Sequence, residues 1–120
     1  MVGDPLAVRQ ELLDFALRLP EAYEDHPWGE SVAKVNKKVF AFFGTGEGAS
    51  RVGFTVKLTD SHDQALSLPC AEPTGYGLAR AGWLTIWLDT SPPPTDVCTD
   101  WIEESYRLIA PKRLVKLLDG

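Results

Sequence analysis

The feature that most constrains the fold is a strict alternation over residues 51–58, RVGFTVKL. Apolar residues occupy every second position from Val52 to Leu58, and polar residues or glycine fill the positions between them. Since successive side chains of a strand point to opposite faces, this period of two predicts a β-strand with one buried and one wet face. Strands of this kind are typical of antiparallel sheets that are covered on one side only.

Four further segments predict strands, at 31–36, 38–44, 76–79 and 83–89. The first two are rich in valine and phenylalanine, which suit a pleated surface, and Asn36-Lys37 predicts a tight turn between them. The glycine-rich stretch GTGEGAS (44–50) predicts a flexible hairpin turn rather than a phosphate loop, because a strand and not a helix follows it.

Helices are predicted at 5–19, 61–68, 96–110 and 112–118. Asp4 before Pro5 is typical of a helix start, and Ser61 with Gln64 three residues later predicts a capping box. Pro111 ends the third helix and begins the fourth. The inward face of helix 96–110 is expected to carry Val97, Trp101, Leu108 and Ile109.

The order of these elements is helix, three strands, helix, two strands and two helices. Their short connections make consecutive strands antiparallel neighbours. The expected class is therefore α+β, with an antiparallel sheet that carries its helices on one face. A length of 120 residues fits a single domain over 1–120, and 44% hydrophobic residues are enough for a core of its own.

The chain is acidic overall but has one basic segment. It holds 12 Lys and Arg against 17 Asp and Glu, a net charge of −5, whereas residues 31–60 hold five basic and two acidic residues. The basic five are Lys34, Lys37, Lys38, Arg51 and Lys57. A hairpin with Lys37 and Lys38 at its tip could reach a phosphate; alternatively, its lysines only solvate the hairpin and discourage edge pairing.

The residue pattern predicts neither a metal or cofactor site nor enzymatic activity. His26 and His62 have no second His or Cys at ligand spacing, and Cys70 and Cys98 stand apart. Ser105 lies mid-helix without a nucleophile-elbow motif. Cys98 is expected to be a small apolar filler, since Asp96 and Asp100 beside it oppose a thiolate.

The location follows from what the chain lacks. No apolar run approaches the ~20 residues of a membrane span, and the N-terminal residues have neither the basic start nor the apolar core of a signal peptide. Isolated cysteines without an export signal predict reduced thiols. The expectation is a cytoplasmic protein without a membrane partner.

Several motifs together resemble the MmcQ/YjbR family of small bacterial proteins. They run in family order: HPWGE (26–30), KVFAFF (38–43), FTVKL (54–58), GWLTIWLD (82–89) and WIEESYRLIAPKRLVKLL (101–118). The resemblance spans nearly the whole chain and implies a secretion-chaperone-like α+β domain with no enzyme chemistry. It also implies DNA binding through a "double wing" of β-hairpins. A pI near 4.9 departs from what strong DNA affinity requires.

The resemblance also bears on the segment EDHPWGE (24–30). Trp28 and Trp83 are expected to be buried core anchors, Gly29 to provide a bend, and Glu30 to pair with Lys38 or Lys57 or to cap backbone donors. The segment is thus interpreted as a plug that seats the first helix on the sheet, rather than as a reactive loop. Two functions stay open: weak DNA binding through phosphates, or a protein-interaction adaptor.

Overall fold

The computed structural model describes residues 4–44, 51–75 and 77–119, without the side chain of Trp28. Its helices are α1 (Pro5–Leu17), α2 (His62–Leu66), α3 (Thr95–Ile109) and α4 (Lys112–Leu118). Its strands are β1 (Tyr23–Asp25), β2 (Ser31–Val35), β3 (Lys38–Gly44), β4 (Gly53–Lys57), β5 (Ala71–Pro73) and β6 (Trp83–Trp87). Two short 3-10 helices are η1 (Pro27–Gly29) and η2 (Leu78–Ala81).

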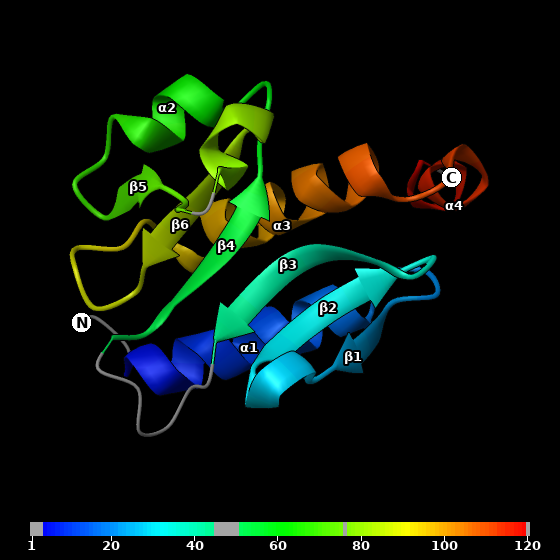
Figure 1. Ribbon diagram of the computed structural model, residues 1–120, viewed down its shortest axis with the longest axis horizontal. Helices are drawn as coiled ribbons and strands as arrows, with labels where there is room; N and C mark the ends of the chain where they lie inside the picture. The colour runs from blue at the N-terminus through cyan, green and yellow to red at the C-terminus, as the bar shows by residue number, and fades with distance from the viewer. Residues whose placement is uncertain (1–3, 45–50, 76, 120) are drawn as a thin grey trace.

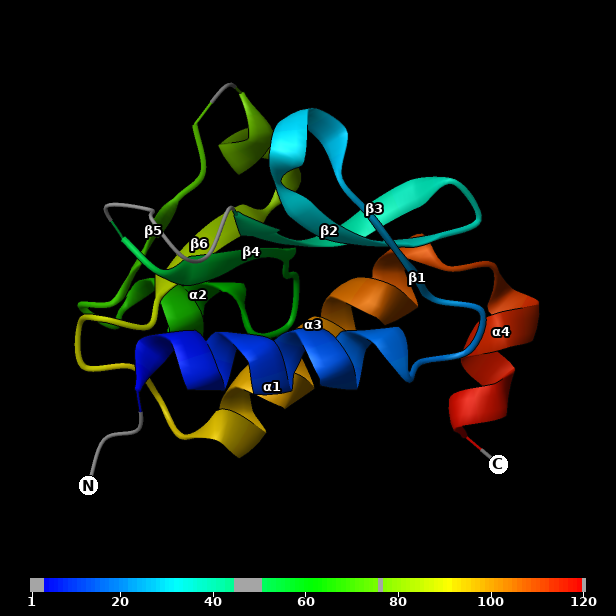
Figure 2. The ribbon, with the colours of Figure 1, turned by 90° about the horizontal axis from the view of Figure 1, so that it is seen from below.

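The six strands form one antiparallel sheet in the order β1-β2-β3-β4-β6-β5 (Figure 1). Helices α1 and α3 lie against one face of the sheet, whereas η1 and η2 rise from the other (Figure 2). The predicted α+β class, with helices packed on one face of an antiparallel sheet, is confirmed.

The core fills the space between the sheet and the two long helices. Phe54 and Val56 of β4 are at most 1% exposed, as the alternation over 51–58 predicted, and they pack with Leu12 of α1 and Ile102 of α3 in one apolar cluster. Burying each large apolar side chain contributes about 1.5–3 kcal/mol. Trp83 is 8% exposed, which confirms its predicted burial, and its ring meets Phe42 edge-on.

The β2–β3 hairpin turns where the sequence predicts it. Asn36 and Lys37 have φ values of 51° and 67°, the left-handed pair that a two-residue turn of type I′ requires. The register between β2 and β3 shifts at Ala33/Lys34, so Phe40 is an extra residue on β3. The shift lets both Phe40 and Phe43 be buried.

Two predictions for the connecting segments were wrong. Tyr23–Asp25, expected within a loop, pairs with β2 as the edge strand β1. Residues 78 and 79 of the predicted strand 76–79 instead begin η2, which lies between Gly77 and Gly82 with φ values of 78° and 95°, while β5 lies earlier. Left-handed glycines at both ends favour a compact turn over a strand. Tyr76 and residues 45–50 of the predicted glycine turn lie outside the described residues.

The helix ends agree with the predictions within about two residues, and one face was assigned wrongly. Asp4 accepts a hydrogen bond from the backbone N–H of Leu6 at 3.2 Å and caps α1, as predicted. Leu108 was expected to point inward but is 40% exposed. The buried stripe of α3 includes a polar residue, Ser105, and runs through Ile102, which turns Leu108 toward the surface.

Candidate functional site

Lys37 and Lys38 lie at the tip of the β2–β3 hairpin. Lys37 is the second residue of the left-handed turn and Lys38 is the first residue of β3; both are exposed. Within the described residues neither side chain makes an ion pair. The two lysines thus lie at the tip, where the sequence placed them, and both ammonium groups face solvent.

Two side chains of helix α3 contact this hairpin at Phe40. The hydroxyl of Ser105 donates to the carbonyl oxygen of Phe40 at 2.6 Å and accepts from the backbone N–H of Lys57 at 2.9 Å. The ring of Tyr106 packs edge-on against Phe40, with centroids 5.2 Å apart, and its hydroxyl donates to the carbonyl oxygen of Pro20 at 2.7 Å. The motif ESYR thus joins β3, β4 and the segment after α1.

Lys34 and Arg51 differ from the tip lysines because each is held in an ion pair. The ammonium of Lys34 lies 3.1 Å from a carboxylate oxygen of Asp25. The guanidinium of Arg51 donates to Asp89 at 2.9 Å and stacks on the ring of Trp87, 4.1 Å from its centroid. This hydrogen bond raises the pKa of Arg51 and lowers the pKa of Asp89 to about 2.

The five predicted cations do not form one strip. Lys57 is half-buried at the end of β4, opposite Trp83 in register, and Arg51 comes just before the start of the same strand. The start of β4 lies away from the β2–β3 tip (Figure 1), whereas its end at Lys57 is joined through Ser105 to Phe40, two residues from Lys38. The structure thus brings Lys37 and Lys38 together, leaves Arg51 apart from them and half-buries Lys57.

The predicted capping box at Ser61 was wrong, although Ser61 does precede α2. Its side chain makes no cap hydrogen bond; the hydroxyl donates instead to Glu104 of α3 at 2.7 Å. The same carboxylate accepts from the backbone N–H groups of Thr59 at 2.9 Å and of Ser61 at 3.2 Å. A carboxylate from a distant helix therefore satisfies the donors of this turn, which a local motif cannot reveal.

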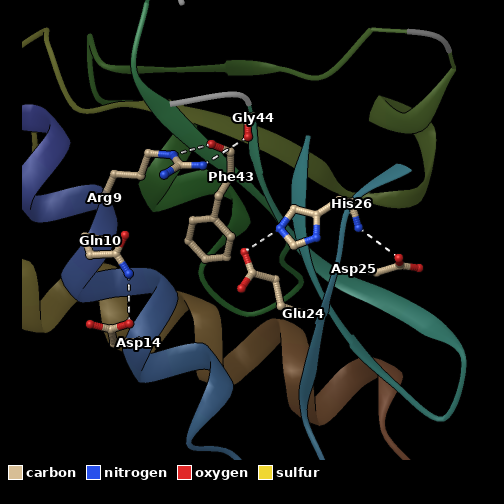
Figure 3. Close-up of polar contacts among 8 residues, drawn as sticks. All are labelled: Arg9, Gln10, Asp14, Glu24, Asp25, His26, Phe43 and Gly44. Atoms are coloured by element: carbon tan, nitrogen blue, oxygen red, sulfur yellow. Dashed lines mark hydrogen bonds and ion pairs between the residues drawn. The ribbon is translucent and has the colours of Figure 1, made fainter. Parts of the chain in front are cut away.

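The segment 24–30 contains local contacts of its own. His26 lies 3.0 Å from a carboxylate oxygen of Glu24 (Figure 3), and Gly29 has a φ of 81°, which fits the predicted bend. Among the described residues, Glu30 makes no ion pair with Lys38 or Lys57, although the sequence predicted such a pair as one of two alternatives. Because the side chain of Trp28 lies outside the description, its role as a core anchor stays a prediction.

Arg9 is a structural residue that sequence reasoning missed. It is 8% exposed on α1 and donates to the carbonyl oxygens of Phe43 at 2.7 Å and Gly44 at 3.0 Å (Figure 3). Burial lowers its pKa below the ordinary value. Arg9 thus ties the first helix to the far end of β3, a task that the sequence interpretation gave to the segment 24–30.

The candidate nucleophiles are either hydrogen-bonded to the backbone, as Ser105 is, or buried, as Cys70 and Cys98 are. The hydroxyl of Ser105 is used in two hydrogen bonds to the backbone. Burial raises the pKa of the Cys98 thiol to about 12 and also raises that of Cys70. In the part of the chain that the structure describes, no three His, Cys, Asp or Glu residues gather as metal ligands, and no helix there is long and apolar enough to cross a membrane.

Comparison with known proteins identifies a family and similar solved structures. The family model described as YjbR matches residues 17–108. The structure is similar to that of the Deinococcus radiodurans protein DR2400, with a DUF419 domain, at a TM-score of 0.73 and 20% identity over 97% of this chain and 91% of that one. A Pseudomonas syringae protein is also similar, at a TM-score of 0.63 and 21% identity over 83% of this chain and 97% of that one. No curated protein matches the chain.

Proposed function

Because the chain belongs to the YjbR family and presents two free lysines on a braced hairpin, we propose that it is a small DNA-associated protein that contacts phosphates. The observation that carries the proposal is the hairpin tip, where Lys37 and Lys38 are exposed and make no ion pair among the described residues. The bracing supports it as well, since a tip fixed through Phe40 loses little conformational entropy on binding.

Contact through phosphates predicts weak binding that is tolerant of DNA sequence. Lysines bind phosphates as point charges, whereas bidentate readers of base edges are mostly Arg, Asn and Gln. The tip, VNKKV (35–39), offers only Asn36 of that kind. Each neutralised phosphate contributes about 0.9 to the slope of log K against log salt. The two tip lysines should therefore contribute a slope of about −1.8.

The same geometry favours a binding role over catalysis, and we propose that the chain is not an enzyme. Ser105 and Cys98 were the nucleophile candidates of the sequence. The Ser105 hydroxyl already bonds to two backbone groups, and the Cys98 thiol is fully buried with a pKa of about 12. Neither group is placed to attack a substrate from solvent.

The proposal is tested by fluorescence anisotropy of a labelled duplex at about 50 mM and about 200 mM salt. Lys37→Ala/Lys38→Ala should lose roughly 1.8 of the wild-type salt slope. Arg80→Glu is the matched control: it changes the net charge by the same −2 at an exposed residue of η2. If wild type shows no binding at the lower salt, or if the tip variant keeps the full slope, the DNA proposal fails and the adaptor interpretation replaces it.

A further inference from the structure

The basic side chains divide by what they contact. All 12 lie in the described part of the chain. Arg9 is buried, Lys57 is half-buried, and four others are held in ion pairs: Lys34, Arg51, Arg107 and Arg113. The remaining six are exposed and make no ion pair with any described residue: Arg18, Lys37, Lys38, Arg80, Lys112 and Lys116.

Five of these six lie on segments that meet at one end of the molecule. The end of α1, the tip of the β2–β3 hairpin and α4 occupy the same end in both views (Figures 1 and 2). Side-chain contacts join α3 and α4 to the segment after α1: the hydroxyl of Tyr106 donates to the carbonyl oxygen of Pro20, and Arg113 of α4 pairs with Glu21 at 3.0 Å. Arg80, the exception, lies in η2 on the face of the sheet opposite α1 and α3 (Figure 2).

Three carboxylates near this end are paired with two guanidinium groups, which leaves one negative charge there against the five free cations. Glu21 bonds to Arg113. Glu103 and Asp119 lie 3.0 and 2.9 Å from the guanidinium of Arg107. A chain of net charge −5 thus keeps five of its six unpaired cations together at one end. Paired surface charges add little to the local potential, whereas a cluster of unpaired ones concentrates anions.

We propose that α4 supplies the second half of the interface, so that Lys112 and Lys116 act with Lys37 and Lys38 as one surface for the phosphates of duplex DNA. The inference rests on the proposed function of the hairpin tip. Lys112 and Lys116 are four residues apart and therefore lie on the same side of α4. Duplex DNA fits such a surface because it presents a dense and regular line of phosphates. Arg18 contributes to the same field from the last turn of α1.

The salt dependence distinguishes this surface from the hairpin tip alone. Four lysine contacts give a slope of about −3.6, so raising the salt fourfold should weaken binding roughly 150-fold. Two contacts give about −1.8 and a loss of roughly 12-fold. Lys112→Ala/Lys116→Ala should therefore bring the slope from about −3.6 to about −1.8, as should Lys37→Ala/Lys38→Ala, whereas Arg80→Glu should leave it unchanged.

The outcomes separate this inference from the function on which it rests. If the α4 variant keeps the wild-type slope while the tip variant loses its share, α4 is no part of the interface and the proposed function stands. If wild type does not bind the duplex at about 50 mM salt, both fail. If Arg80→Glu lowers the salt slope as much as the α4 variant does, the binding reflects net charge and not this surface. If the wild-type chain binds poly-glutamate as tightly as the duplex, the surface attracts anions in general and is not specific for duplex DNA. A thermal melt of each variant is the control for folding, and each variant should unfold in a cooperative transition as the wild type does.

Discussion

The hydroxyl of Ser105 lies 2.6 Å from the carbonyl oxygen of Phe40, to which it donates a hydrogen bond across 65 residues of sequence. The hydroxyl oxygen of Ser105 also accepts a hydrogen bond from the backbone N–H of Lys57 at 2.9 Å. One small side chain on α3 thus joins β3 and β4 close to the hairpin tip that carries the free lysines. The residue that looks most like a nucleophile is therefore a structural bridge.

Replacing Ser105 by alanine should lower the free energy of unfolding by about 1–3 kcal/mol, because the substitution leaves buried backbone groups of Phe40 and Lys57 without their partner. Ser67→Ala is the matched control. Its hydroxyl is exposed and donates to the carbonyl oxygen of Gln64, so the change should stay within about 0.5 kcal/mol. Urea unfolding measures both; equal midpoints for the two variants would show that the bridge contributes nothing.

Glu104→Ala should destabilise the fold by about 1.5–3 kcal/mol, since its carboxylate accepts three hydrogen bonds from Thr59 and Ser61. Ser61→Ala removes one of the three and should cost about 1 kcal/mol. Glu103→Ala is the control on the same helix, because its partly solvent-accessible pair with Arg107 contributes about 1 kcal/mol. A Glu103 variant as unstable as the Glu104 variant in thermal unfolding would disprove this role of Glu104.

Gly53→Ala should cost about 1–3 kcal/mol through overpacking. A Cβ at this position would lie 2.6 Å from the carbonyl oxygen of Ile86 and 2.7 Å from a ring carbon of Trp87, and the backbone of β6 cannot easily yield. Gly75→Ala is the control, because nothing lies within 4 Å of its added Cβ. Differential scanning calorimetry should show a lower midpoint for the first variant only; an unchanged midpoint for Gly53→Ala would contradict this packing.

Asp89 should titrate with a pKa of about 2, held down first by the hydrogen bond from Arg51 and then by those from Thr90 and Val52. A folded pKa below the ordinary 3.8 means that the contribution of Asp89 to stability is complete above pH 3.8 and is lost as the pH falls toward 2. A carboxyl carbon NMR titration measures this, and Arg51→Ala should move the midpoint back toward 3.8. An unchanged midpoint in that variant would mean that Arg51 does not set the pKa of Asp89.

The features that the sequence predicts correctly are those encoded locally. The alternation over 51–58 and the Asn36-Lys37 turn depend on neighbouring residues, and both occur as predicted. Strand β1 was missed because Tyr23–Asp25 is short and exposed, and only its pairing with β2 makes it a strand. The role of Ser61 was predicted wrongly and the bridging role of Ser105 was not predicted, because their partners lie more than 40 residues away.

Only the hairpin half of the candidate surface was predicted from the sequence, because only that half is encoded locally. The tip lysines were found because the local charge of residues 31–60 is positive. The lysines of α4 were missed because residues 91–120 hold four basic and five acidic residues and look nearly neutral along the chain. In the fold, two of those acids are paired with Arg107: Glu103 on α3 and Asp119 at the end of α4. Charge counted along a sequence cannot show which charges the fold neutralises.

The most direct test of the account is a ¹⁵N-HSQC titration of the wild-type chain with an unlabelled duplex at about 50 mM salt. The largest chemical-shift changes should fall on residues 36–39 and 112–118, which carry the free lysines of the hairpin tip and α4. Amides of η2, around Arg80, should not shift. Raising the salt to about 200 mM should reverse the changes. Shifts confined to β4 and η2, or no shifts at the lower salt, would contradict the claim that this end of the molecule binds DNA.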